Sequence, residues 1–308
     1  MDVELNVTYI TFDGHVQVHK YRYLYFWIMF IIYILILCCN LTIVFLIVVQ
    51  ESLHEPMYIF IAALLLNSVL FSTVIYPKLL IDFLSERQVI SFAACFFQIF
   101  VFYSLGGSEF LLLAAMAYDR YVSICKPLQY PTIMRKNTVT GLMVLAWILP
   151  SVEIAAATIM TANKKMCVFT LKGIFCNSTV FKLQCVQSSD EMIKSMIILV
   201  HVSILPVLFI LFTYTRILII SYRSNREVRK KATQTCLPHL FVLISFFCLC
   251  ACDIIIVGVE SNFSKTVRLV MTLQIVIYHP LFNPIIYGLK MKEISKHLKR
   301  LFIRVKMT

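Results

Sequence analysis

The sequence predicts an all-α protein: a seven-transmembrane helix bundle followed by a short amphipathic helix on the membrane surface. Hydrophobic residues make up 60% of the 308-residue chain and charged residues only 14%; a soluble globular domain is nearer half apolar and a quarter charged. The apolar residues gather into seven runs, and a spanning helix needs about 20 such residues. Glycine is scarce, with 7 residues, and the absence of an alternating ten-residue pattern argues against a membrane barrel.

Seven apolar runs define the expected helices. They are residues 23–49, 58–84, 93–124, 139–160, 193–221, 237–257 and 267–289. Cysteines deep in these runs are expected to be small buried hydrophobes: Cys38, Cys39, Cys248, Cys250 and Cys252. We therefore expect an extracellular tail over 1–22, a seven-transmembrane domain over 23–289 and a cytoplasmic tail over 290–308.

The net charge of +12 is distributed as in a membrane protein. Basic residues gather in two loops, 126–136 and 222–231, and in the tail after Leu289, so that face is predicted to be cytoplasmic. This distribution makes a nucleic-acid partner unexpected. Three glycosylation sequons fall on the opposite face, which supports a plasma-membrane protein with an extracellular N-terminus: Asn6, Asn177 and Asn262.

Residues 291–305 have the pattern of an amphipathic helix. Ile294, Leu298, Leu301 and Phe302 share one face, with lysine and arginine elsewhere. That pattern suits a helix lying on an anionic leaflet. Membrane lipid is therefore an expected partner.

The stretch from Met116 to Pro131, MAYDRYVSICKPLQYP, leaves the third apolar run for a basic loop. Asp119 and Arg120 stand at that boundary, at the predicted inner end of a helix. Ionisable residues are inexpensive at helix ends, so the pair is either an anchor that fixes helix depth or a switch in which Arg120 exchanges Asp119 for another partner.

MAYDRY followed by CKPLQYP resembles the signature of odorant receptors, within the rhodopsin-like G-protein-coupled receptors. Further matches occur at Asn40, at Pro56-Met57-Tyr58, at Trp147, in KATQTCLPHL (231–240) and in HPLFNPIIY (279–287). The resemblance covers about Asn40 to Glu293 and is closer to fish receptors than to mammalian ones. It implies a receptor that binds a small-molecule odorant and activates a heterotrimeric G protein of the olfactory, stimulatory type.

The same resemblance implies a set of activation residues at the cytoplasmic side: Asp119, Arg120, Tyr121, Tyr214, Asn283, Pro284 and Tyr287. Pro284 removes a helix hydrogen bond, and we expect Asn283 to satisfy the carbonyl that is freed. The resulting joint is either a hinge or a static kink.

Four cysteines face outward: Cys95 at the start of the third run, and Cys167, Cys176 and Cys185 in the loop 161–192. Four cysteines allow three pairings. The resemblance implies that Cys95 pairs with Cys176 and Cys167 with Cys185, which would pin a lid over the outer mouth.

An odorant pocket is expected among the outer halves of helices three, five, six and seven, where residues of mostly apolar type suit a small-molecule site. The predicted lining is Phe102, Tyr103, Gly106, Gly107, His201, Val202, Phe247, Cys250, Ala251, Ile254, Leu273 and Val276. The paired glycines either leave room for a ligand or let helices approach. His201 is either a ligand contact or a satisfied core histidine.

Glu109 lies well inside the third run, where an unpaired carboxyl is costly. We expect it to face the bundle, protonated or hydrogen-bonded, in a structural or switch role.

Two other functional classes remain as alternatives: a rhodopsin-like receptor for a non-odorant small ligand, and a polytopic transporter. A transporter calls for repeated halves or several charges along a path, and the sequence has neither. It also lacks the HExxH and GxSxG motifs and any cluster of metal ligands in the runs. We therefore expect no enzyme activity, no cofactor and no metal.

Overall fold

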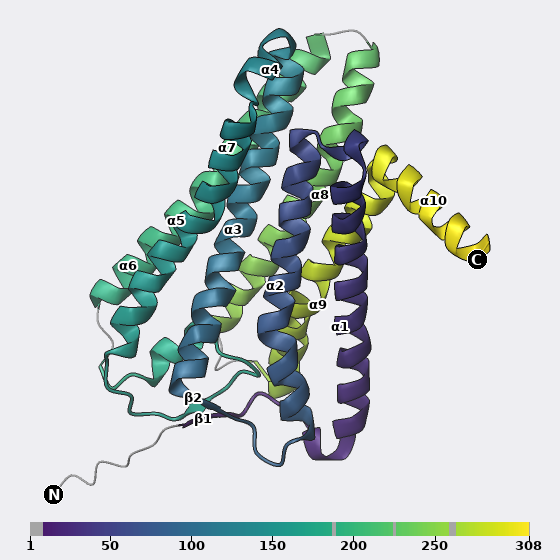
Figure 1. Cartoon of the computed structure of the whole chain (residues 1–308). Helices are drawn as coiled ribbons and strands as arrows, with labels where there is room; N and C mark the ends of the chain where they lie inside the picture. The colour runs from purple at the N-terminus through teal and green to yellow at the C-terminus, as the bar shows by residue number, and fades with distance from the viewer. Residues whose placement is uncertain (1–8, 187–188, 224–225, 259–262, 308) are drawn as a thin grey trace, which may run out of the picture.

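A computed structural model describes residues 9–186, 189–223, 226–258 and 263–307. Asn6 and Asn262 lie outside these residues, as does the side chain of Ile254. The described chain is almost wholly helical, and its long helices run side by side as one bundle (Figure 1).

The predicted runs correspond to long helices. They are α1 (Val18–Val49), α2 (Pro56–Leu84), α3 (Phe92–Cys125), α5 (Lys136–Ala162), the rod α6–η4–α7 (Ser189–Leu199, Val200–Ile204, Leu205–Arg223), α8 (Arg226–Gly258) and α9 (Lys265–Lys290). Within the described residues, six are long and apolar enough to cross a membrane, and α8 adds a shorter apolar stretch, Cys236–Cys252. The seven-helix fold is confirmed.

One end of the bundle, called here the disulfide end, is covered by a small sheet that the sequence did not predict. Its strands are β1 (Tyr9–Phe12), β2 (Val89–Ser91) and β3 (Thr170–Leu171), in the order β2-β1-β3. β1 is antiparallel to β2 and parallel to β3. Part of the predicted extracellular tail, residues 9–12, therefore joins the cover, and α1 begins at Val18 rather than residue 23.

A glycine contact holds this cover together. A Cβ added to Gly14 would lie 2.4 Å from the carbonyl carbon of Gly173. Only glycine fits such a close approach of two backbones, so the segment after β1 lies directly on the loop after β3.

The opposite end, called the Arg120 end, carries the short helices η1 (Glu51–Leu53), η2 (Pro127–Gln129) and α4 (Tyr130–Ile133), together with α10 (Lys292–Met307). α10 leaves α9 at an angle and points away from the bundle (Figure 1). Ile294 is fully buried, and Leu298 packs at Gly288 of α9. The start of the predicted apolar face thus contacts the bundle, while its contact with membrane lipid stays a prediction.

Two prolines in α9 each leave a backbone carbonyl without its helical hydrogen bond. In both cases a side chain from another helix donates to that carbonyl. Pro280 cannot donate to the carbonyl of Val276, and the hydroxyl of Tyr76 on α2 donates to it at 3.4 Å. Pro284 cannot donate to the carbonyl of Pro280, and the amide of Asn40 on α1 donates to it at 3.0 Å. The expectation that Asn283 fills this role is therefore wrong.

Candidate functional site

A buried carboxyl organises the middle of the bundle. Glu109 on α3 is fully buried and accepts hydrogen bonds from the side-chain amides of Asn67 on α2 at 3.0 Å and Asn283 on α9 at 2.9 Å. His279 Nε2 lies 3.0 Å from Glu109 Oε1, and the Asn283 amide also donates to Ser68 Oγ at 3.0 Å. These five residues, the Glu109 hub, join α2, α3 and α9.

The hub answers two questions that the sequence left open. Glu109 is hydrogen-bonded, as expected for a carboxyl at this depth. Asn283 is directed at Glu109 because Asn40 already pairs the carbonyl beside Pro284. Trp147 of α5 donates to Asn67 Oδ1 at 3.4 Å, which brings a fourth helix into contact with the hub.

At the Arg120 end, Asp119 and Arg120 form a buried ion pair in which Arg120 Nε donates to Asp119 Oδ2 at 2.9 Å. The hydroxyl of Tyr130 on α4 donates to the other carboxylate oxygen at 2.8 Å. Burial and the adjacent Asp119 charge raise the pKa of Tyr130, which keeps the phenol protonated as a donor. Sequence reasoning missed Tyr130, although it lies in the CKPLQYP stretch.

The three tyrosines of the predicted activation set gather nearby. Tyr214 on α7 and Tyr287 on α9 are buried in the same apolar cluster, and Tyr121 packs against it. His239 of α8, also missed, places Nδ1 3.4 Å from the Tyr287 hydroxyl. Helices α3, α7, α8 and α9 therefore all contribute polar side chains to the buried layer beside Arg120.

Only part of the predicted odorant lining comes together. Phe102 and Tyr103 of α3 lie in one apolar cluster with Leu273 and Val276 of α9. The Phe102 ring contacts those of Phe71, at 4.9 Å between centroids, and Phe175, at 5.2 Å. The Tyr103 hydroxyl accepts a hydrogen bond from the backbone N–H of Ser178 at 2.9 Å. Tyr103 therefore contacts the loop that follows β3, called here the covering loop.

The two glycines have different surroundings. A Cβ on Gly107 would lie 2.3 Å from Val202 and 2.8 Å from Pro150, so Gly107 lets helices approach. A Cβ on Gly106 would meet nothing within 4 Å. Val202 thus packs on a helix rather than facing an open pocket.

Several other predicted lining residues face elsewhere. His201 lies 3.5 Å from Glu153 of α5 and is half exposed, so it is not a core histidine. Phe247 is 47% exposed on the outer surface of α8, and Cys250 and Ala251 are half-buried. Three cysteines expected to be buried are exposed as well, because the outer face of a membrane helix is apolar without being buried: Cys38, Cys39 and Cys248.

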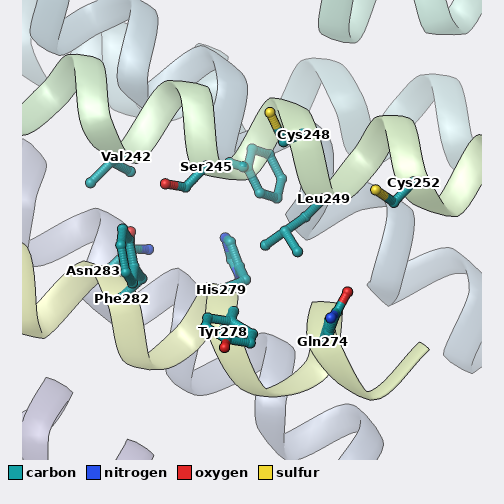
Figure 2. A pocket seen from close by; sticks show the side chains of 11 residues that line it. Val242, Ser245, Cys248, Leu249, Cys252, Gln274, Tyr278, His279, Phe282 and Asn283 are labelled. Atoms are coloured by element: carbon teal, nitrogen blue, oxygen red, sulfur yellow. The ribbon is translucent and has the colours of Figure 1, made fainter. Parts of the chain in front are cut away.

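The structure instead shows a cavity of about 330 Å³ between α8 and α9 (Figure 2). It is lined by Val242, Ser245, Phe246, Cys248, Leu249, Cys252, Gln274, Tyr278, His279, Phe282 and Asn283. None of the predicted lining residues borders it. The sequence signal for this cavity is the presence of polar residues on otherwise apolar helices, Ser245 and Gln274 among them.

Both disulfides implied by the resemblance are present, with Cα separations of 5.4 Å for Cys95–Cys176 and 4.8 Å for Cys167–Cys185. Asn177 follows directly and is only 6% exposed. Its side-chain oxygen accepts from the backbone and the hydroxyl of Thr179, at 3.1 Å and 2.6 Å, and caps η3 (Ser178–Leu183). This burial argues against the predicted glycan at Asn177, because the amide has little room for an attached sugar.

Comparisons with known proteins agree with this architecture. Squid rhodopsin superposes with a TM-score of 0.75 at 18% identity, covering 94% of this chain and 87% of the rhodopsin chain, which shows the fold. Human olfactory receptor 2AG2 is 35% identical, with 88% of this chain and 86% of the receptor covered. Mouse olfactory receptor 1E16 is 34% identical, with 94% and 92% covered.

Human olfactory receptor 13C2 is 32% identical, with 91% of both chains covered. These relatives are receptors rather than enzymes, and the closer likeness to fish receptors stays a prediction. A model of the olfactory receptor family matches residues 29–305. With that match across nearly the whole bundle, this multi-pass membrane protein belongs to the olfactory receptor family.

Proposed function

We propose that the protein lies in the plasma membrane, binds a small-molecule odorant at the disulfide end and activates a heterotrimeric G protein of the stimulatory, olfactory type at the Arg120 end. The N-terminus and the disulfides are then extracellular. Two observations support this orientation. Disulfides persist in oxidising compartments, and basic residues of the described chain gather at the Arg120 end, among them Lys126, Arg135, Lys136 and Lys292.

The odorant would contact the part of the predicted lining that the fold brings together. Phe102 and Tyr103 of α3 face Leu273 and Val276 of α9 beneath the covering loop. Gly106, on the same helix, borders open space. Aromatic and aliphatic side chains with one hydroxyl suit a small, mostly apolar ligand.

The Glu109 hub supplies the link between the two ends. A ligand that draws α3 and α9 together or apart acts on the two helices that the hub joins, through the Asn283–Glu109 hydrogen bond and the close His279–Glu109 contact. Such a ligand shifts the population toward the arrangement that it binds better. The hub residue Asn283 precedes Pro284, so a change in its hydrogen bonds bends α9 near Tyr287, and the hinge alternative is favoured.

The observation that carries the proposal is the buried Asp119–Arg120 pair. Arg120 is 8% exposed, and its guanidinium group is paired with the carboxylate of the preceding residue, Asp119. Tyr214 and His239 lie close enough for the guanidinium charge to influence them electrostatically. A partner surface at this end can therefore replace Asp119 as the acceptor, and basic loops around it attract acidic protein surfaces.

Ligand-driven cyclic AMP production in cells tests the proposal. A panel of alcohols, aldehydes, carboxylic acids and amino acids first identifies an agonist for the unmodified receptor. Arg120→Ala is then expected to reduce the maximal response at least tenfold with surface expression intact. Arg87→Ala, an exposed arginine at the disulfide end, is the matched control and should respond normally.

A normal response of Arg120→Ala would refute the switch role and leave the pair as a depth anchor. The alternative, a receptor for a non-odorant small ligand, predicts that no member of the panel acts while Arg120→Ala still changes ligand-independent cyclic AMP.

A further inference from the structure

We propose that the α8–α9 cavity is a second binding site, for a small aliphatic alcohol that enters from the bilayer. The site shares none of the predicted odorant lining, so this inference stands whether or not the proposed odorant pocket is correct.

The mouth of the cavity lies on the lipid-facing surface. Cys248 and Gln274 are exposed, and Tyr278 is 55% exposed. Cys248 belongs to the apolar stretch Cys236–Cys252 of α8, and Tyr278 lies near the middle of α9. The exposed side of a membrane helix at that depth faces hydrocarbon rather than water, so the occupant must be soluble in the membrane.

The floor of the cavity contains a polar atom without a partner. His279 is 3% exposed, and its ring rises from α9 into the space beneath α8 (Figure 2). Neither ring nitrogen, Nδ1 or Nε2, has a hydrogen-bond partner among the residues that the structure describes. The neighbouring amide of Asn283 is already used by Ser68 and Glu109. A buried polar atom left unpaired is unfavourable, so His279 favours an occupant that can pair with it.

The contact of His279 with Glu109 decides which group suits Nδ1. Nε2 lies 3.0 Å from a carboxyl oxygen of Glu109, although outside hydrogen-bond geometry. A carboxyl oxygen at this distance favours a proton on the nitrogen that faces it, which leaves Nδ1 as an acceptor in the neutral ring. The occupant therefore needs a donor. A hydroxyl meets this need and also accepts from Ser245, whose side chain lines the same cavity (Figure 2).

The rest of the lining sets the size and polarity of the occupant. Val242, Phe246, Leu249 and Phe282 offer an apolar wall. The volume of about 330 Å³ lies at the low end of small-molecule cavities, roughly 300–1,000 Å³. A medium-length alkyl chain with one hydroxyl group fits this description better than a membrane lipid.

Photolabelling of the full-length receptor in phosphatidylcholine vesicles tests the site. The probe is 1-octanol with a diazirine in its alkyl chain, and labelled positions are identified by mass spectrometry. We expect labels on residues 242–252 and 274–283. Unlabelled 1-octanol should suppress them at about one tenth of the membrane concentration that n-octane needs, the ratio given by one buried hydrogen bond.

Two variants with the same substitution sharpen the test. Cys248→Phe fills the mouth of the cavity and is expected to lower labelling at least tenfold. Cys38→Phe places the same ring on the exposed surface of α1 and should leave labelling unchanged. The competition between octanol and octane uses the unmodified protein, so it decides the question even if Cys248→Phe fails to fold.

Three results would overturn the proposal. Labels spread evenly over the helices would show simple partition into the bilayer. Equal competition by octane and octanol would remove the role of His279. Competition by cholesterol without competition by 1-octanol would assign the cavity to a membrane sterol.

Discussion

The two ends of the bundle are held together by different kinds of interaction. At the disulfide end, two covalent bonds, backbone pairing in a three-stranded sheet and the contact of Gly14 with Gly173 fix the cover. At the Arg120 end, the Asp119–Arg120 ion pair lies within α3. The hydroxyls of Tyr130 on α4 and Tyr287 on α9 then connect elements through Asp119 and through His239 on α8. Side-chain pairs of this kind can exchange partners, whereas disulfides cannot, so the same helices have one fixed end and one adjustable end.

Removing a disulfide at the disulfide end is expected to have the largest effect of the changes considered, a loss of thermal stability. Cys95–Cys176 closes a sequence separation of 81 residues and Cys167–Cys185 one of 18. From loop-closure entropy, the first bond contributes about 4.5 kcal/mol to the free energy of unfolding and the second about 3 kcal/mol. We expect Cys95→Ser with Cys176→Ser to lower the thermal unfolding midpoint of the purified receptor more than Cys167→Ser with Cys185→Ser.

Equal midpoints for the two double variants would contradict this ordering. An unchanged midpoint in both double variants would show that the disulfides do not fix this end of the bundle.

His15 at the disulfide end tests whether that end is wholly fixed. Its ring is 8% exposed and meets Phe83 edge-on. Burial, followed by the charges of Lys78 and Lys265, lowers the pKa of His15 from 6.5 to about 4. Above pH 6.5 the ring is neutral in both the docked and the released segment. Between pH 6.5 and about 4 the released segment binds a proton first, so docking weakens as the pH falls.

The full loss amounts to about 3 kcal/mol. It is measured as hydrogen-exchange protection of the Thr11 and Phe12 amides, which donate to Phe169 and Gln88. His15→Phe keeps the aromatic contact and should flatten the pH dependence. A slope that persists in this variant would assign it to another group.

The smallest expected effect concerns the adjustable end. Tyr130→Phe removes the hydroxyl that donates to Asp119, a loss of about 1 kcal/mol that frees Arg120 about fivefold more often. We expect ligand-independent cyclic AMP to rise by that factor at equal surface expression. Tyr222→Phe, an exposed tyrosine of α7, is the matched control. Lower basal signalling in Tyr130→Phe would mean that Tyr130 supports the signalling state instead.

Hydropathy and motif resemblance were sufficient for the helices and for both disulfides, whereas the roles of the activation residues stay predictions. These features depend on local composition or on short, specific stretches such as the one around Arg120. The expected pocket was less successful because it depends on how each helix is rotated about its axis. In the fifth span, η4 is a π-helix turn that changes this rotation, so Val202 packs against Gly107 and His201 lies beside Glu153.

Hydropathy was also insufficient for residues whose role depends on a contact with another helix, far away in the sequence. Hydropathy could not indicate that Asn40 rather than Asn283 pairs the carbonyl beside Pro284, because the two are on different helices. Nor could it separate apolar residues that face lipid from those that face the core, and Cys248 was therefore expected inside.

The central position of β1 in the sheet has a consequence for biosynthesis. This strand leaves the ribosome before either neighbour, and β3 follows only after four long helices have been made. At roughly 5–20 residues per second, the wait is on the order of 10 s. β2 follows after two of those helices, so through the whole interval it is the β3 edge of β1 that stays unpaired. A chaperone that shields this edge would raise the yield of mature receptor.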